Sequence, residues 1–161
     1  MRFRLVSVCA FVALVAALLA WGGAGEDRPA LAASKTVTDA VTVIKSDVGW
    51  SLRLRAFEVL RKEGTADAIA ELVKLTEHES LRVSTMACTT LARMKKDAAK
   101  AKLKTIIENT SEKAPVRLAA MNALARQGTL ADRAWIDSKA KSDPKLSGQL
   151  SVLKKMSLWK N

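Results

Sequence analysis

Two stretches of the chain, LRLRAFEVL at residues 52–60 and VRLAAMNAL at residues 116–124, align without gaps, and in both the alignment continues to a Gly-Thr pair. A third stretch, VSTMACTTL at residues 83–91, fits between them, so that one shared alanine recurs at spacings of 31 and 33 residues. Self-similarity at a period of about 20–50 residues is typical of repeat architectures. We therefore interpret this motif as the repeating unit of the fold.

Each copy of the motif predicts a first helix, because apolar residues recur at every third or fourth position with good helix formers between them. A second helix is predicted after each first one, near residues 66–76, 97–109 and 130–141. Gly64 and Gly128 fall where the chain must turn. The residues of the second helices predicted to face the core are Ile69, Leu72, Val73, Leu75, Ala99, Leu103, Ile106, Ile107, Ala134, Trp135 and Ile136.

The two ends of the repeat region are predicted to be half repeats. Residues 36–45 have an apolar face and are interpreted as a second helix whose first helix is missing. Asp143 and Pro144 suit the start of a last helix, and Ser80 is placed to cap an earlier one. The apolar faces of these end helices comprise Val37, Ala40, Val41 and Ile44 at one end and Leu146, Leu150, Leu153 and Met156 at the other.

Together these patterns predict an all-α fold. It is a short right-handed α-solenoid, or α-α superhelix, of stacked helix pairs that follows an N-terminal signal segment. A stack of this kind needs about three units to bury a continuous core, and the chain supplies them. A single three-helix or four-helix bundle is the alternative, but it would leave the recurrence of the motif unexplained.

The first 32 residues are predicted to be a signal peptide or an N-terminal anchor. Arg2 and Arg4 precede an uncharged apolar run at residues 5–21, and small residues suited to cleavage follow. Residues 33–161 then form the repeat domain, which we expect to be exported, either periplasmic or secreted. If cleavage does not occur, residues 5–21 anchor the chain in the membrane.

Composition narrows the classes of function. A chain of 161 residues suits one domain, and one histidine and two cysteines argue against a zinc, haem or triad site built from side chains. No glycine-rich phosphate loop is present. We therefore predict that the protein is not an enzyme, and we assign no catalytic, cofactor-binding or metal-binding residue and no cofactor.

Several reactive side chains are interpreted structurally. Cys88 is the only cysteine of the exported part and could be a redox or intermolecular thiol, but it aligns with Phe57 and Met121, which favours a buried apolar position. Arg53 and Arg117 recur at one repeat position, which favours a ladder in which each arginine caps or bridges to an acidic neighbour. Solvated positions are predicted for His78 and, with salt bridges, for Glu58, Asp67, Glu71, Asp132 and Asp137.

The pattern Leu/Val-Arg-x-x-Ala-x-x-x-Leu followed by Gly resembles HEAT-like repeats, most closely those of the phycobilisome-lyase type. It is present at residues 52–64 and 116–128, whereas the middle copy has Ser84 in place of the arginine and Lys95 in place of the glycine. The resemblance covers roughly residues 36–156. It implies an α-solenoid, in a family that includes scaffolds, adaptors, nucleic-acid binders and a few chromophore lyases.

The chain is strongly basic, with a formal net charge of +11, and the charge is concentrated in the middle repeat. Lysine also serves to keep a helix surface soluble, so an ordinary solvated face and a docking surface for an anionic partner are both open. Nucleic acid is not expected as a partner of an exported protein. The tentative partner-binding residues are Arg93, Lys95, Lys96, Lys100, Lys102, Lys104 and Trp135.

Three functions follow from these observations. The first is a non-catalytic scaffold or adaptor that binds a partner protein on a concave surface lined by the second helices. The second is a binder of an anionic membrane surface or envelope polymer through the basic face. The third is a lyase-like protein that handles a chromophore, which the family resemblance alone implies.

Overall fold

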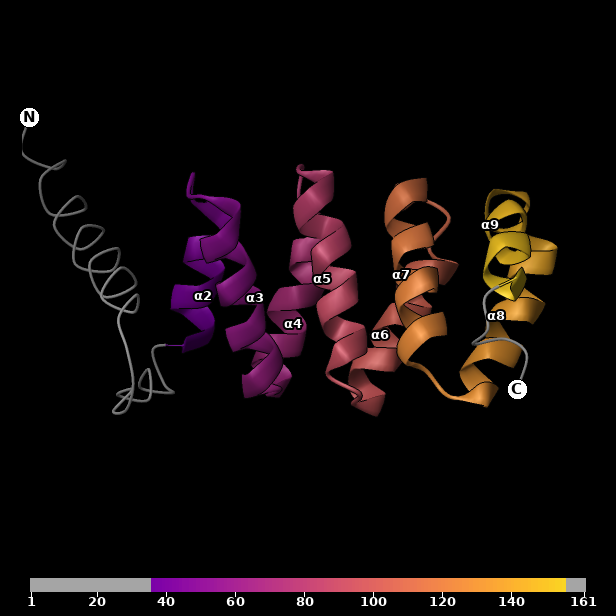
Figure 1. Ribbon diagram of the computed structural model, residues 1–161, viewed down its shortest axis with the longest axis horizontal. Coiled ribbons are helices and arrows are strands. Elements are labelled where there is room, and N and C mark those ends of the chain that lie inside the picture. The colour runs from indigo at the N-terminus through magenta and orange to yellow at the C-terminus, as the bar shows by residue number, and fades with distance from the viewer. Residues whose placement is uncertain (1–35, 156–161) are drawn as a thin grey trace, which may run out of the picture. The chain divides into compact units, whose positions relative to one another are not determined.

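The computed structural model describes residues 36–155, and within this range every regular element is an α-helix (Figure 1). The all-helical prediction is confirmed there. The predicted signal or anchor segment, residues 1–32, and Met156 lie outside the described residues. The helices are α2 (Thr36–Lys45), α3 (Trp50–Glu63), α4 (Ala66–Thr76), α5 (Leu81–Arg93), α6 (Asp97–Glu108), α7 (Ala114–Gln127), α8 (Leu130–Ser142) and α9 (Pro144–Lys155).

The helices form four hairpins. The most extensive contacts between consecutive helices join α2 to α3, α4 to α5, α6 to α7 and α8 to α9, whereas α3–α4, α5–α6 and α7–α8 touch less. The prediction of half repeats at the two ends is therefore wrong, because the first and last described helices each have a full partner. The repeat period is the same whichever helix begins the unit, so periodicity alone does not reveal the pairing.

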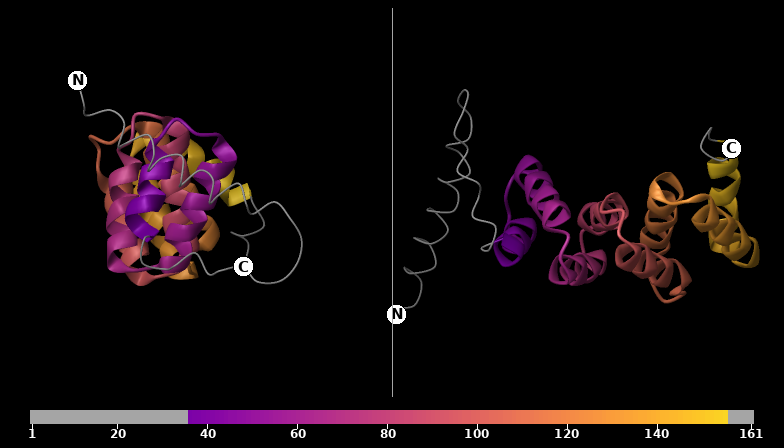
Figure 2. Two further views of the ribbon diagram at one scale, coloured as in Figure 1. Left: turned by 90° about the vertical axis from the view of Figure 1, so that its left-hand side faces the viewer. Right: turned by 90° about the horizontal axis from the view of Figure 1, so that it is seen from below.

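The hairpins stack in sequence order, with the odd-numbered helices in one row and the even-numbered helices in another. α5 lies directly against α7 in front of α4 and α6 in Figure 1, and the right-hand view of Figure 2 shows these two pairs of helices on opposite sides. Beyond its hairpin partner α3, helix α2 contacts α4, and beyond its hairpin partner α8, helix α9 contacts α7. This is a solenoid of stacked helix pairs and not a bundle around one centre. The handedness of its superhelix stays a prediction.

Most of the predicted core is buried. All the core positions expected in α6 are buried, as are Ile69, Leu72 and Leu75 in α4, whereas Val73 is half-buried. The prediction fails in α8, where Ala134 is exposed and Trp135 is half-buried. The residues that α8 buries are Asp132, Ile136 and Ala140, at a regular spacing of four.

The turns after α3, α5 and α7 use two backbone conformations. Gly64 has a φ of 55°, and Lys95, at the aligned position of the middle repeat, adopts the same left-handed conformation with a φ of 56°. Gly128 instead has a φ of −80°. A Cβ atom at Gly128 would lie 2.4 Å from the Leu124 carbonyl oxygen, so this turn requires glycine for close approach.

The two predicted helix caps have different outcomes. Asp143 is confirmed, since its Oδ1 accepts a 2.9 Å hydrogen bond from the Lys145 amide at the start of α9. Ser80 is wrong, because its side chain makes no capping bond to α5. The half-buried His78 compensates locally, and its Nδ1 accepts a 3.0 Å hydrogen bond from the Ser80 amide.

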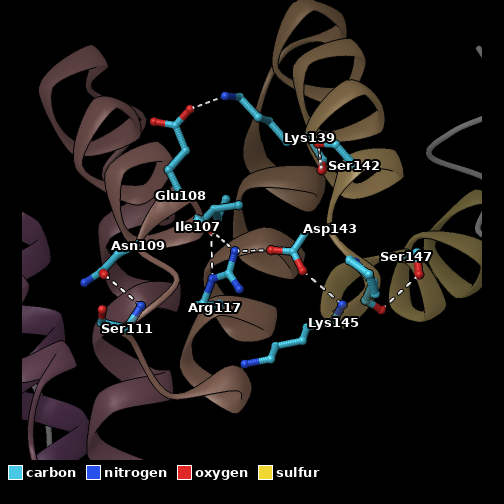
Figure 3. Close-up of polar contacts among 11 residues, drawn as sticks. Ile107, Glu108, Asn109, Ser111, Arg117, Lys139, Ser142, Asp143, Lys145 and Ser147 are labelled. Atoms are coloured by element: carbon cyan, nitrogen blue, oxygen red, sulfur yellow. Dashed lines mark hydrogen bonds and ion pairs between the residues drawn. The ribbon is translucent and has the colours of Figure 1, made fainter.

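The recurrent arginines clamp the preceding helix within each hairpin, which confirms their structural interpretation. Arg117 on α7 is 2% exposed, and its Nε and Nη2 donate to the Ile107 carbonyl near the end of α6 at 2.8 and 2.6 Å. Its Nη2 also meets Asp143 Oδ2 at 2.5 Å, which links this hairpin to the next one (Figure 3). Arg53 on α3 donates to the Ser46 carbonyl just after α2 at 2.7 Å.

Replacement of the two arginines should therefore differ in cost although they share one repeat position. We expect Arg117→Ala to lower the free energy of unfolding by about 3–5 kcal/mol, because it leaves the Ile107 carbonyl and Asp143 without their buried partner. Arg53→Ala, at a more exposed clamp, should cost about 1–2 kcal/mol. Urea denaturation followed by circular dichroism measures both, and equal losses would contradict the clamp.

Cys88 lies in the contact between α5 and α7 and is fully buried. Its Sγ is 3.9 Å from the Val116 carbonyl oxygen on α7. Desolvation by burial, followed by the charge of Glu112, raises the pKa of the Cys88 thiol to about 12. The thiol is thus a core group, as its alignment with Phe57 and Met121 predicts.

This environment makes Cys88 unreactive in the folded protein. In a Cys9→Ser chain at pH 8, the thiolate fraction should be about a thousandfold below that of a free cysteine, and burial slows access further. We expect a disulfide reagent such as Ellman's reagent to label Cys88 only after unfolding in urea. Rapid stoichiometric labelling without denaturant would instead make it an accessible thiol.

Candidate functional site

Two of the predicted partner-binding lysines of α6, Lys100 and Lys104, reach a buried carboxylate on α8. The side chain of Asp132 is only 7% exposed, and its Oδ1 lies 2.7 Å from Lys104 Nζ. Lys100 Nζ is 4.0 Å from the other oxygen of Asp132 and 3.5 Å from Asp97 Oδ1. Two lysines of the predicted basic cluster are therefore neutralised inside the repeat stack.

Asp132 also completes the N-terminal cap of α8. Its Oδ2 accepts hydrogen bonds from the amide and hydroxyl of Thr129 at 2.9 Å each, and the Thr129 hydroxyl accepts one from the Asp132 amide at 3.3 Å. This reciprocal pair is a capping box. The expectation of a solvated carboxylate is wrong at Asp132, because its chain position says nothing of the lysines on α6.

Trp135 belongs to the same junction. The Nζ atoms of Lys104 and Lys139 lie 5.3 and 5.9 Å from the centre of its ring, within the range of cation–π attraction. Lys139 in turn pairs with Glu108 at the end of α6 at 2.5 Å. The half-buried indole thus helps to hold α8 against α6.

The ionisation of Asp132 is tied to this junction. Burial raises its pKa, but the bonds from Lys104 and Thr129 outweigh burial and lower the pKa to about 2. An unfolded aspartate has a pKa of about 3.9. Since the folded pKa is the lower one, the stabilisation is complete well above pH 4 and is lost as the pH falls through about 2.

Asp132→Asn should therefore destabilise the protein in a pH-dependent way. We expect the free energy of unfolding to fall by about 2–3 kcal/mol at pH 7, and the difference from the parent chain to shrink below about 1 kcal/mol at pH 2. The exposed Asp67, in the first turn of α4, provides the control, and Asp67→Asn should change stability by less than about 0.5 kcal/mol. A constant loss at all pH values for Asp132→Asn would contradict the role of its charge.

The rest of the basic cluster lies at the turn between α5 and α6. Lys96 donates to the Gly64 carbonyl, and Arg93 lies 3.9 Å from Glu58 on α3. Lys95 and Lys102 are exposed and have no ion pair within residues 36–155. The structure thus brings Lys100, Lys104 and Trp135 together at the α6–α8 junction and places Arg93, Lys95 and Lys96 at a separate edge.

A cleft of about 440 Å³ opens where α6, α7 and the α8–α9 turn meet (Figure 3). Arg117 and Asp143 line it and are paired with each other, and so are Lys139 and Glu108. Most of its charged groups are therefore committed to the fold. In the described part of the chain, no group of three or more His, Cys, Asp or Glu side chains is arranged to hold a metal ion.

A second hollow, of about 490 Å³, lies on the row of odd-numbered helices, and we call it the α5–α7 groove. Its walls are formed by small side chains, those of Thr85 and Thr89 on α5 and of Ala119 and Ala123 on α7. Arg82 lies at one side, with its guanidinium carbon 4.0 Å from the centre of the Trp50 ring. The complete lining is Trp50, Arg82, Thr85, Met86, Thr89, Ala119, Asn122, Ala123, Arg126 and Gln127.

No motif in the sequence marks this groove. Its residues come from helices that the repeat pattern places next to each other, but each side chain alone is an ordinary surface residue. The available signal was charge, because α5, α7 and α9 contain no aspartate or glutamate. The dense lysine run of the middle repeat drew the prediction to α6 instead.

The fold and these surfaces define a class, the α-solenoids built from stacked helical hairpins. The family model for HEAT repeats matches residues 38–125, a span within α2–α7 that takes in the first three hairpins. The chain therefore belongs to the HEAT repeat family. The phycobilisome-lyase subtype stays a prediction. No curated protein matches the sequence.

One solved structure has the same fold, that of human deoxyhypusine hydroxylase in complex with glycerol. The likeness has a TM-score of 0.57 at 19% sequence identity and covers 99% of this chain and 59% of that one. The chain thus corresponds to 59% of the length of that protein. At this identity the likeness shows the fold alone.

This comparison corrects the prediction that the protein is not an enzyme. That prediction used composition and repeat architecture to exclude catalysis, yet a hydroxylase has the same fold. The exclusion is therefore wrong as an inference from the class of protein.

Among the described residues, no helix is both long and apolar enough to cross a membrane.

Proposed function

We propose that this HEAT repeat protein is a scaffold that binds a partner protein in the α5–α7 groove, and that it acts after export. The observation that carries the proposal is the groove itself, a hollow of about 490 Å³ on the row of odd-numbered helices. Repeat stacks offer extended surfaces of this kind to polypeptide partners. Export rests on the basic and apolar pattern of residues 1–32.

The groove is the favoured binding surface because its two arginines, Arg82 and Arg126, have no ion pair within the described residues. Asn122 Oδ1 accepts a 3.1 Å hydrogen bond from Gln149 on α9, which leaves the amide hydrogens of Asn122 for a ligand. At the α6–α8 junction and in the cleft beside Arg117, by contrast, most charged side chains already pair with one another. A partner can therefore dock in the groove without breaking ion pairs of the fold.

Two exposed residues of the predicted basic cluster follow the groove residues at the end of α5. Arg93 lies one helical turn beyond Thr89 on α5, and Lys95 follows in the turn. A polypeptide in the groove would therefore continue toward these two side chains. Their predicted role in partner binding becomes part of this proposal, whereas Lys100, Lys104 and Trp135 serve the α6–α8 junction.

A photo-crosslinking experiment tests the scaffold function. A benzophenone amino acid at Thr89, an exposed position in the groove, should give a discrete adduct with one protein in the exported fraction. The same group at Ala101, an exposed position on α6, should not. Mass spectrometry identifies the partner, and binding is then measured with both purified proteins.

The substitution Thr89→Trp provides the matching loss-of-function variant. The indole would fill the groove while replacing an exposed side chain, so we expect binding of the purified partner to fall more than tenfold with an unchanged melting temperature. Ala101→Trp is the control and should bind like the parent chain. Equal adducts at both positions, or full binding by Thr89→Trp, would contradict a partner site in the groove.

A further inference from the structure

Charge is segregated between the two rows of the solenoid. The acidic side chains of the described helices lie on α2, α3, α4, α6 and α8, and none lies on α5, α7 or α9. On α3, Glu58 is already bound to Arg61 at 2.6 Å. Helices α5, α7 and α9 of the odd-numbered row therefore carry basic side chains and no acidic ones.

Two arginines of the α5–α7 groove lack a carboxylate partner. Arg82 stacks on Trp50, and neither it nor Arg126 has an ion pair within the described residues 36–155. Both guanidinium groups keep their donors, and arginine binds carboxylates in a two-pronged geometry. Arg82 lies in the first turn of α5 and Arg126 in the last turn of α7, so the two positions lie toward opposite ends of the groove.

The length of the groove sets the size of its occupant. Its lining on α7 extends from Ala119 to Gln127, which corresponds to about 12 Å along the helix axis. An extended peptide advances about 3.3 Å per residue, so about four residues fit along the α7 side of the groove. The small side chains of Thr89, Ala119 and Ala123 leave room for a peptide backbone. The side-chain amide of Asn122 offers this backbone a hydrogen-bond donor.

We propose that the α5–α7 groove binds a short extended acidic segment of a partner protein, with carboxylates at Arg82 and Arg126. This inference rests on the proposed scaffold function and adds the chemistry of the partner. An anionic membrane is the less suitable occupant, because a bilayer surface does not enter a narrow hollow between two helices. The charge of the row matches an acidic ligand, and the hollow matches a single polypeptide chain.

The test uses the form of the protein that accumulates in cells and a fluorescent probe peptide, Gly-Ser-Glu-Glu-Glu-Glu-Ser-Gly. Its affinity is measured by fluorescence anisotropy at several salt concentrations and compared with that of the peptide containing four Gln in place of Glu. We expect the Glu peptide to bind at least tenfold more tightly, and added salt to weaken it. Arg82→Gln and Arg126→Gln should each reduce its affinity about tenfold.

Lys102→Gln is the matched control, since Lys102 is also exposed and without an ion pair among the described residues, but lies on α6. This variant should bind the Glu peptide like the parent chain. Equal binding of the Glu and Gln peptides, or equal losses in all three variants, would overturn the acidic-segment inference. A third result would also overturn it. In that case the protein binds phosphatidylglycerol vesicles but not the peptide, and Arg82→Gln and Arg126→Gln weaken the vesicle binding.

The failure of this inference differs from failure of the scaffold function. If Thr89→Trp abolishes binding of the crosslinked partner but the Glu peptide does not bind, the acidic segment is wrong and the groove remains the partner site. If neither the peptide nor a partner depends on the groove, both proposals are wrong. Both proposals are supported if Thr89→Trp abolishes binding of the partner and of the Glu peptide, and if Arg82→Gln and Arg126→Gln weaken binding of the peptide.

Discussion

The contact between successive hairpins is the constraint on which the rest of this structure depends. A single hairpin leaves its apolar stripe uncovered, so each one is stable only against its neighbour. The contact of α5 with α7 is among the closest in the stack, and Ala87, Cys88, Ala120 and Met121 are fully buried on these two helices. Small residues also line the outer side of the same contact, and these leave the hollow that we assign to a partner.

The helices could be predicted from the sequence because their signals are local. The apolar period, the turn glycines and Pro144 place α4 at its observed bounds and α6, α8 and α9 within about two residues. The pairing of helices was missed, because a repeat of constant period has no marked beginning. Only the relative closeness of α2–α3 and α3–α4 shows that the hairpin starts with an even-numbered helix.

The predicted basic cluster is divided by the fold, because charge density along the chain is not charge density in space. Lys100 and Lys104 are close to Lys102 in sequence, yet they share a buried aspartate that follows about thirty residues later. Conversely, Arg82 and Arg126 are far apart in sequence and line one groove. A linear scan therefore gives equal weight to Lys100 and Lys104, which the fold pairs with carboxylates, and misses arginines that have no ion pair within the described residues.

The repeat architecture also explains how one fold can serve an enzyme and a scaffold. Arg117, Cys88 and Gly128 satisfy the backbone and the core, and they would do so whatever the outer surfaces carry. Exposed side chains of the odd-numbered row are free of these demands, so their substitution changes binding without changing the stack. The absence of acidic residues from α5, α7 and α9 is therefore not required by folding, and it is the feature from which we propose an acidic ligand.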